Sequence, residues 1–263
     1  MSDTARTAAA LLWQHWQART RLANLPSACR PASRAQGYAV QAELAGLTGQ
    51  SVAGWKIAAT SSAGQQHIGV DGPLAGRLFA DRMLAPGATV SLAGNQMRVI
   101  EAEFAFRMAH DLPPRTAPYT QAEVMAAVES LHPTIEVPDS RFENFASAGQ
   151  AQLIADCACA CWLIVGPPMP SRWRSADLAA HPVRVLLGQV EVALGRGANV
   201  LGDPRIALTW IANEVARHGP GLKAGDLVTT GTCVAPVTVS EGDRMRADFG
   251  ELGSLEMSLA SAS

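Results

Sequence analysis

The alternation of apolar and polar residues divides the chain into a helical beginning and a β-rich remainder. Apolar residues recur at helical spacing from Thr4 to about Leu25. A second stretch of this kind runs from about Arg34 to Leu47 and ends near Gly49. The first fifty residues are therefore predicted to be helical.

Short β-rich runs separated by Gly, Pro and Asp follow, a pattern that is typical of a sheet. These runs are GWKIAAT, RLFADRML, TVSLAG, MRVIEAEFAFRM, PTIEVPD and CACACWLIVG. From DLVTTGT onward the chain alternates apolar and polar residues between Gly-Asp turns, which predicts several antiparallel strands.

Two helices interrupt the predicted strands. The first begins at Thr120, forms a capping box with Glu123 and must end by His132, because a proline follows. The second is capped by Asp203, starts with a proline and ends at Gly219. Together the elements predict an α+β fold of mixed sheets, in which a small helical N-terminal portion (residues 1–50) packs on a mostly β body (residues 51–263).

The composition is that of a globular protein, and it argues against several classes of function. Hydrophobic residues make up 48% of the 263 residues and charged residues 17%, with 21 Lys and Arg against 23 Asp and Glu. There is no basic run and aromatic residues are few, so we predict no nucleic-acid partner. The chain has no secretory-signal pattern and no run of about 18 apolar residues, so we predict a cytoplasmic protein with no membrane partner.

The five cysteines predict buried, reduced thiols. Cys157, Cys159 and Cys161 stand at alternate positions of an apolar run, as expected for one face of a strand. No Cys-x-x-Cys pair occurs, and three positions so close along one strand do not suit a tetrahedral zinc site.

The motifs of several familiar catalytic mechanisms are absent. The sequence has no Gly-x-Ser-x-Gly elbow, no Gly-Lys-Ser/Thr loop and no His-x-x-x-His pair on a helix. Gly195, Gly197 and Gly202 lack the spacing of a dinucleotide fingerprint and predict a hairpin or a loop that closes over a substrate. The six histidines share no spacing, and only His67 remains a candidate for chemistry.

Three glutamates form the most informative pattern. Glu101 and Glu103 lie two apart in VIEAEFAF, so both carboxylates project from one face of a strand, as they would also on a solvated sheet. Glu136, in PTIEV, stands among β-branched apolar residues, where an uncompensated carboxylate is costly. If the three converge, a hard divalent cation such as Mg²⁺ or Mn²⁺ is the simplest compensation.

Lys56 is a second unusual charge, because GWKIAAT is apolar on both sides of it. Its side chain either extends to the surface or points toward the carboxylates. In the second case its ammonium neutralises three carboxylates together with one divalent cation, and it can donate or accept a proton.

Further polar residues flank these positions. Asp139 and Arg141 follow Glu136 closely, where Arg141 either holds a carboxylate beside a metal site or makes an ordinary ion pair in a turn. The segment Thr229–Thr232 offers hydroxyl and N–H groups around a glycine, as a cradle for a substrate carboxylate or as a simple turn. We take Asp139, Arg141 and Thr232 as candidate substrate-binding residues.

The order of the motifs points to a family. GWKIAATS, GVDGPLAGRLFAD, IEAEFAF, PTIEVPDSRF, IADCACA, GRGANVLGDPRIALTWIANE, VTTGT and GDRMRADFGELGS follow one another from about residue 10 to the end. This set resembles the 2-keto-4-pentenoate hydratase and 4-oxalocrotonate decarboxylase group of the fumarylacetoacetate hydrolase superfamily. The joint occurrence is far more specific than any one motif.

The resemblance implies a fold, a cofactor and a substrate class. The fold is a mixed β-sheet roll of the fumarylacetoacetate hydrolase type, with residues 51–263 as the catalytic domain. Mg²⁺ or Mn²⁺ is held by Glu101, Glu103 and Glu136, Lys56 is the active-site lysine, and the substrate is a small 2-oxo acid that chelates the metal. The family also implies a homo-oligomer and a role in the catabolism of aromatic compounds.

The activity implied first is a lyase reaction, the hydration of a 2-hydroxy-2,4-dienoate to a 4-hydroxy-2-oxo acid. Decarboxylation of a 4-oxalocrotonate-type acid is an alternative, because the metal-bound 2-oxo group would accept electron density in that reaction as well. Carbon–carbon hydrolysis of an acylpyruvate is another, with His67 as its only candidate base. A catalytically silent subunit that stabilises an active homologue is the hypothesis from a different class.

The chain departs from the family pattern at three positions. Leu74 stands where many hydratases of the group carry Asp, which weakens the hydratase assignment. Cys157 and Cys159 replace the Asn and Ser of the common ADNAS run, which removes two hydrogen-bonding groups near the substrate. These departures predict an unusual substrate.

Overall fold

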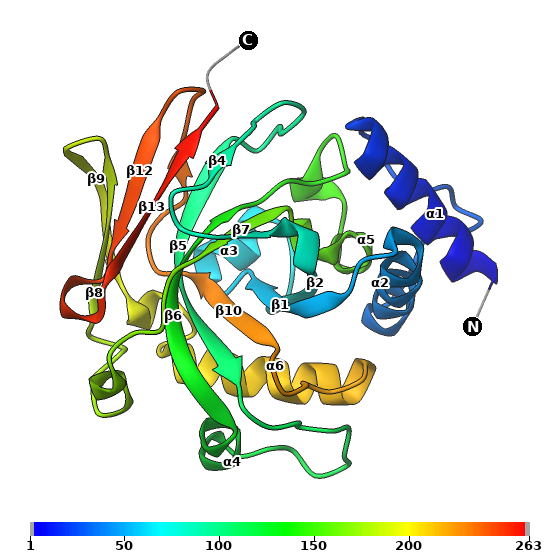
Figure 1. Cartoon of the computed structure of the whole chain (residues 1–263). Coiled ribbons are helices and arrows are strands. Elements are labelled where there is room, and N and C mark those ends of the chain that lie inside the picture. Colours follow the sequence, from blue (N-terminus) through cyan, green and yellow to red (C-terminus); the bar gives the residue numbers. More distant parts are fainter. Residues whose placement is uncertain (1–2, 261–263) are drawn as a thin grey trace.

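Two helices begin the chain and lie together at one side of the molecule (Figure 1). The structure is a computed structural model that describes residues 3–260. Helix α1 spans Asp3–Ala18 and α2 spans Arg34–Thr48, whose ends match the prediction. The Ser33 side chain caps the start of α2, and Gly49 ends it in the left-handed region.

Helix α1 is shorter than predicted, because the residues after Ala18 serve another purpose. Arg19 turns the chain at a positive φ of 54°. Leu22 then forms an isolated parallel bridge with Phe142, donating its N–H to the carbonyl of Arg141. Tertiary pairing thus overrides the helical pattern between Arg19 and Leu25.

A large mixed sheet of eight strands forms the centre of the molecule. Its strand order is β2-β1-β10-β5-β6-β7-β3, and β11 also pairs with β5. The pairs β1/β10 and β3/β7 are parallel, and the others are antiparallel. The strands are β1 Val52–Ala58, β2 Leu74–Phe79, β3 Met83–Leu84, β5 Val99–Met108, β6 Val128–Val137, β7 Trp162–Val165, β10 Leu227–Thr232 and β11 Val237–Thr238.

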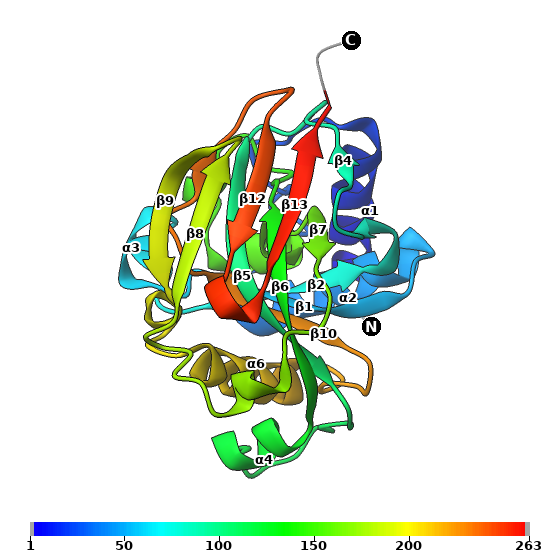
Figure 2. The ribbon, with the colours of Figure 1, turned by 60° about the vertical axis from the view of Figure 1, so that its left-hand side comes forward.

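A second sheet of five strands packs against β5 and β6. Its order is β4-β13-β12-β8-β9, with β9 at one edge (Figure 2). Aromatic rings fill the space between the sheets, where Phe104 and Phe249 meet edge to face at 5.0 Å. The strands are β4 Thr89–Val90, β8 Pro182–Leu187, β9 Val190–Arg196, β12 Arg244–Asp248 and β13 Ser254–Leu259.

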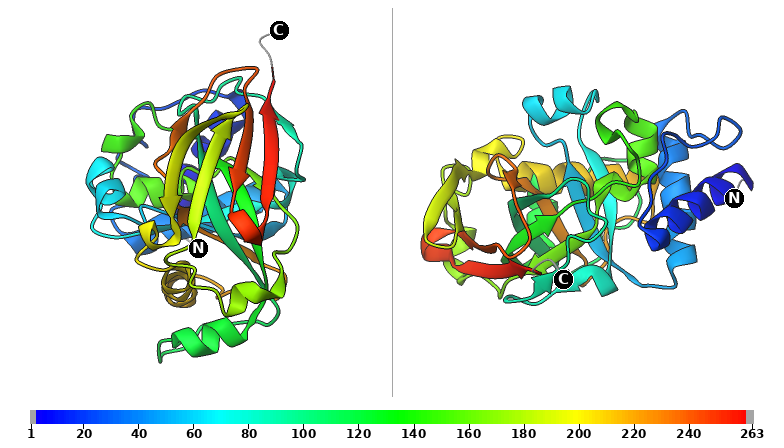
Figure 3. Two further views of the ribbon diagram at one scale, coloured as in Figure 1. Left: turned by 90° about the vertical axis from the view of Figure 1, so that its left-hand side faces the viewer. Right: turned by 90° about the horizontal axis from the view of Figure 1, so that it is seen from above.

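The remaining helices are mostly short and lie around the large sheet (Figure 3). The longest, α6, packs on β10 and β2, begins at Pro204 with Asp203 as its cap and ends at His218, as predicted. The others are α3 Ser62–His67, α4 Gln121–Ala126, α5 Gln150–Ala155 and the 3-10 turns η1 Ala80–Arg82, η2 Phe145–Ser147, η3 Cys157–Cys159, η4 Ser171–Arg174, η5 Gly197–Asn199 and η6 Gly250–Leu252. The curled mixed sheets with few helices confirm the predicted fold class.

Two further predicted boundaries were wrong, the end of the helix after Thr120 and the start of the strand that follows it. The capping box of Thr120 and Glu123 is present, but α4 ends at Ala126 instead of reaching His132. Residues from Val128 onward belong to β6, because they pair with β5 between Glu101 and Met108. The prediction erred in continuing the helix to the next proline, since this proline lies inside the strand.

The segment around the cysteines was also mispredicted. Cys157 and Cys159 are not on a strand, because the residues from Cys157 to Cys159 form a tight turn and β7 begins only at Trp162. All five cysteines are free thiols, as predicted. In the part of the chain that the structure describes, no helix is long and apolar enough to cross a membrane.

Candidate metal centre

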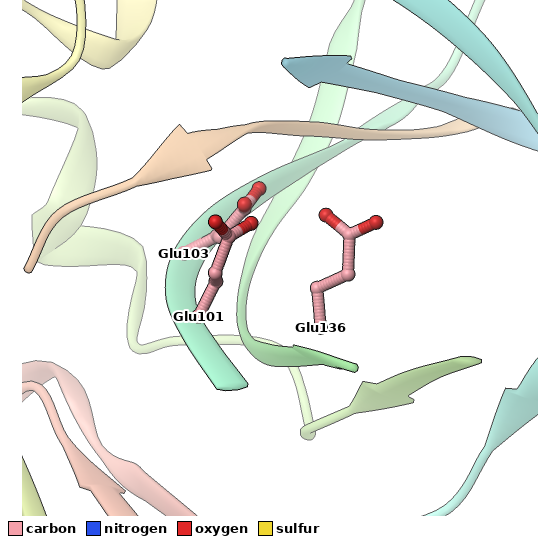
Figure 4. A group of neighbouring side chains, drawn as sticks. All are labelled: Glu101, Glu103 and Glu136. Atoms are coloured by element: carbon pink, nitrogen blue, oxygen red, sulfur yellow. The ribbon is translucent and has the colours of Figure 1, made fainter. Parts of the chain in front are cut away.

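Two neighbouring strands bring the three glutamates together. In the antiparallel pair β5/β6, Glu101 lies opposite Glu136, and Glu103 follows two positions along β5 on the same face. Figure 4 shows the three carboxylates extending from the two strands toward a common region. One oxygen from each lies within 4.8 Å of the other two.

The environment of these carboxylates is not that of a solvated sheet. Glu103 and Glu136 are fully buried, and Glu101 is half-buried. Glu103 Oε2 accepts a hydrogen bond of 2.8 Å from the Gly231 N–H, whereas Glu103 Oε1 and Glu136 Oε2 have no partner. Burial raises the pKa of all three carboxyls, and that of Glu136 rises to about 7. The hydrogen bonds of the protein therefore do not fully compensate the charge of this cluster.

Lys56 points into the cluster. Its side chain is 3% exposed, and Nζ lies 3.2 Å from Glu136 Oε1 and donates to the Ala158 carbonyl at 2.9 Å. Burial by itself would lower the pKa of Lys56, but the charges of Glu136, Glu101 and Glu103 outweigh it and raise the pKa. Lys56 is therefore a charged, buried member of the site and does not extend to the surface.

The residues fit a divalent cation. Three carboxylates and one ammonium leave two negative charges, which one divalent cation neutralises. Oxygens that share a Mg²⁺ at about 2.1 Å lie no more than about 4.2 Å apart, so small side-chain movements suffice to close this site. The all-oxygen donor set suits Mg²⁺, Mn²⁺ or Ca²⁺ better than Zn²⁺.

A cavity of 560 Å³ opens beside the cluster. Lys56, Glu101 and Thr232 line it, so a bound molecule can reach the ammonium and one of the carboxylates. Thr232 belongs to strand β10, where an irregular register beside Gly231 replaces the predicted turn and gives the Gly231 N–H to Glu103. The predicted carboxylate cradle thus holds a carboxylate of the protein itself.

A left-handed turn presents the carbonyl that holds Lys56. Cys157, Ala158 and Cys159 have φ angles of 51°, 50° and 64°, which lie in the left-handed region that residues other than glycine rarely occupy. The turn sits against β2, where a Cβ on Gly76 would lie 1.9 Å from the Cys157 carbonyl oxygen. Only glycine at position 76 permits this close approach.

A buried ion pair secures the same turn. Arg141 pairs with Asp156 and also donates to the carbonyl oxygens of Asp156 and Ala160, and Ser140 donates to the Asp156 carboxylate at 2.8 Å. Burial raises the pKa of Asp156, and Arg141 opposes that shift. These contacts fix both ends of the strained segment, which explains how it persists.

Asp139 and Arg141 do not line the cavity. Asp139 forms an ion pair with Arg21 and accepts from the Gln96 N–H at 3.0 Å. The Arg141 guanidinium lies 3.9 Å from the ring centre of Trp16 on α1. In this arrangement both residues support the site from outside the cavity, and of the three candidate substrate-binding residues only Thr232 borders it.

Comparison with known proteins decides the family. A sequence model of the fumarylacetoacetate (FAA) hydrolase C-terminal domain matches residues 63–260, three quarters of the chain. The chain belongs to the fumarylacetoacetate hydrolase family. It is 35% identical over 207 residues to 2-keto-4-pentenoate hydratase 1 of Dechloromonas aromatica, covering 79% of this chain and 77% of that protein. It is 31% identical to a 2-keto-4-pentenoate hydratase of Paraburkholderia phymatum, covering 99% and 100%.

A solved structure of the same family agrees over nearly the whole chain. The 4-oxalocrotonate decarboxylase from Pseudomonas putida G7, complexed with magnesium and adipate, superimposes with a TM-score of 0.89 at 27% identity, covering 98% of both chains. Hydratases and a decarboxylase are thus both similar to this member of the fumarylacetoacetate hydrolase family.

Leu74, Cys157 and Cys159, which differ from the usual residues of the family motifs, lie in or beside the cavity wall. Leu74 is fully buried on β2 and lines the cavity, and so does the half-buried Cys159. Cys157 is fully buried in the left-handed turn.

Sequence reasoning missed the roles of Gly76 and the Ala158 carbonyl. A backbone acceptor leaves no side-chain signal. The glycine of the AGRL run was a visible hint of a close backbone approach.

Proposed function

We propose that this chain is a metal-dependent lyase that adds water to a 2-hydroxy-2,4-dienoate to give a 4-hydroxy-2-oxo acid. The observation that carries the proposal is the convergence of three inward carboxylates and a charged lysine at the wall of a cavity. Its similarity to named 2-keto-4-pentenoate hydratases supports this chemistry.

Glu101, Glu103 and Glu136 are the residues that would hold Mg²⁺ or Mn²⁺. When bound, the cation supplies positive charge that draws electron density from the 2-oxo group of the substrate. Glu103 is kept in place by the Gly231 N–H and Glu136 by Lys56, so two of the three ligands are preorganised by the chain itself.

Lys56 is the residue that we assign to proton transfer. Two contacts of its ammonium are made by Ala158 and Glu136, and the side chain also lines the cavity. An ammonium has three N–H donors, so one remains for the substrate. Lys56 Nζ would give a proton to the terminal carbon of the dienol and regain one from its 2-hydroxyl group, which leaves a conjugated enone. Water then adds across the double bond, its hydroxyl to the fourth carbon and its proton to the third. Thr232 would contact the substrate in the same cavity.

Decarboxylation is the second candidate, because a decarboxylase superimposes over 98% of both chains. The deciding experiment follows the ultraviolet absorbance of 2-hydroxypenta-2,4-dienoate, 2-oxohex-3-enedioate and an acylpyruvate with and without Mg²⁺. A 4-hydroxy-2-oxo acid as the main product supports hydration, release of CO₂ supports decarboxylation, and pyruvate supports hydrolysis with His67, which also lines the cavity. The absence of all three products would favour the silent-subunit hypothesis.

We further propose that the protein acts as a homo-oligomer in the cytoplasm, on small acids and without a nucleic-acid or membrane partner. Supporting this assembly, β9 lies at an edge of the smaller sheet (Figure 2). Its residues Val190 and Leu194 are each 64% exposed. Apolar side chains on an unpaired sheet edge favour contact with another subunit. Light scattering of the purified chain tests the oligomer.

A further inference from the structure

The cavity wall beyond the metal cluster is mostly apolar, with Thr60, Ser61, His67, Asn199 and Thr232 as its polar members. Strand β2 contributes Leu74, α5 contributes Leu153, and the end of α3 and the turn η2 contribute Ile68 and Phe145. Leu74 and Leu153 belong to the fully buried core, and Ile68 and Phe145 pack against it. Further apolar members of the wall are Ile57, Met97, Val99, Pro138, Val234 and Pro236.

Cationic side chains are almost absent from this wall. Lys56 is the one Lys or Arg among the lining residues, and it is already paired with Glu136. Arg141, on the segment after β6, forms an ion pair with Asp156 and does not line the cavity. His67 lies at the exposed end of α3, in edge-to-face contact with Phe145. A second carboxylate on a substrate would therefore be buried without a counter-ion, which is strongly unfavourable.

The cavity is also larger than a five-carbon acid requires. Pockets of about 300–1,000 Å³ enclose drug-sized ligands, and 560 Å³ falls within that range. A small dienoate held at Glu101 and Lys56 would leave much of the apolar wall in contact with water. An apolar substituent at the far end of the substrate would displace that water.

We propose that the site selects 2-hydroxy-2,4-dienoates that carry an uncharged, apolar substituent at the end remote from the carboxylate, and that it rejects dicarboxylates. This inference rests on the proposed function and narrows its substrate class. Leu74 fits it, because an apolar side chain at this position adds to the wall.

The test compares substrates that differ only at the remote end. We would measure kcat/KM with Mg²⁺ for 2-hydroxypenta-2,4-dienoate, its 5-methyl, 5-propyl and 5-phenyl derivatives, and 2-hydroxyhexa-2,4-dienedioate, scoring any product. We expect kcat/KM to rise about fourfold for each added methylene group. The dicarboxylate should be at least about 100-fold poorer than the 5-methyl compound. A flat or falling series, or a dicarboxylate as good as the 5-methyl compound, would overturn the inference.

A pair of variants at one wall position sharpens the test. Ile68→Lys adds a cation to the half-buried apolar wall, and Ile68→Gln is an uncharged control of similar length. The lysine variant should shift the preference toward the dicarboxylate at least about tenfold, because it supplies the missing counter-ion. The glutamine variant should weaken the longer substrates without this shift. Equal behaviour of the two variants would contradict the proposed charge selection.

Binding measurements separate this inference from the proposed function. Calorimetric titration of the Mg²⁺-loaded protein with 2-oxopentanoate, 2-oxooctanoate and 2-oxohexanedioate needs no turnover. Tightest binding of 2-oxooctanoate with no turnover of any dienol would retain the selectivity and refute the lyase proposal. Turnover of dienols together with equal binding of the three acids would retain the lyase proposal and refute the selectivity.

Discussion

At the scale of single residues, the position of Lys56 depends on backbone atoms. Its ammonium donates to the Ala158 carbonyl, which a strained left-handed turn presents, and this turn fits against β2 only because residue 76 has no side chain. The chemistry assigned to Lys56 therefore depends on a glycine that lies opposite it on the neighbouring strand β2.

Gly76→Ala tests this dependence. The new Cβ would lie 1.9 Å from the Cys157 carbonyl oxygen, so the turn must move and take the Ala158 acceptor with it. We expect a loss of about 1–3 kcal/mol in the free energy of unfolding and at least a tenfold loss of kcat, measured by urea denaturation and initial rates. Gly72→Ala is the matched control, since nothing lies within 4 Å of the Cβ there. Unchanged kcat in the Gly76 variant would disprove the link.

Glu103→Gln tests the metal centre at the level of one charge. The amide keeps an acceptor for the Gly231 N–H, so the variant should retain its fold by circular dichroism. Mg²⁺ affinity should fall more than about 100-fold and Mg²⁺-dependent turnover should disappear, because a ligand charge is lost. Glu129→Gln, on an exposed position of β6, should change neither property. An unfolded Glu103 variant would instead indicate a structural role for the carboxylate.

At the scale of elements, prediction succeeded where side chains mark a boundary locally. Thr120 and Asp203 both cap helices as expected, because a capping side chain satisfies backbone donors only a few residues away. The two-residue spacing of Glu101 and Glu103 likewise follows from strand geometry alone.

Prediction failed where distant pairing overrides local preference. Residues 128–132 look helical but pair with β5, and Cys157–Cys159 alternate like a strand but are held in a turn by Arg141 and Asp156. The convergence of Glu136 with Glu101 could be suspected from its apolar neighbours, but the register that places them opposite each other depends on the whole sheet.

Asp156→Asn tests the turn as an element. Removing the charge leaves the buried Arg141 guanidinium without its anion, which should cost about 3 kcal/mol in the free energy of unfolding. Turnover should fall as well, because the turn that carries the Ala158 carbonyl loosens. The double variant Arg141→Met with Asp156→Leu should recover much of the stability but little of the activity, as judged by denaturation and rates. Full recovery of both would show that the turn does not position Lys56.

At the scale of the whole molecule, the buried carboxylates of the metal centre lower the free energy of unfolding by an amount that depends on pH. Burial raises the pKa of the cluster carboxyls, to about 7 for Glu136, so the folded metal-free protein binds more protons than the unfolded chain between about pH 4.5 and 7. Its stability therefore decreases as the pH rises through that window. A bound cation removes the cost by compensating the ionised carboxylates.

The increase in Tm produced by Mg²⁺ should thus grow between pH 5 and pH 8. Differential scanning fluorimetry with and without Mg²⁺ at each pH measures it. Glu136→Gln should show a smaller dependence, because it removes one of the titrating groups. A pH-independent Mg²⁺ effect in the unmodified chain would mean that the carboxyls stay ionised throughout.

The assembly proposed for the chain is tested at the edge of the smaller sheet. Leu194→Lys places a charge on the most exposed apolar part of β9, so it should lower the oligomer mass measured by light scattering. Thr238→Lys, on an exposed position of β11, is the control and should leave the mass unchanged. An intact oligomer in the Leu194 variant would place the interface elsewhere.

The contact of α1 with Arg141 has a consequence for shortened forms of the chain. The family domain match begins at residue 63, yet Trp16 stacks on Arg141, Arg21 pairs with Asp139, and Leu22 bridges to Phe142. A fragment that begins at Arg34, with α2, would keep Lys56 and every carboxylate of the cluster but expose the arginine that anchors the turn. Such a fragment should lose activity because α1 no longer covers Arg141, although no residue of α1 lines the cavity.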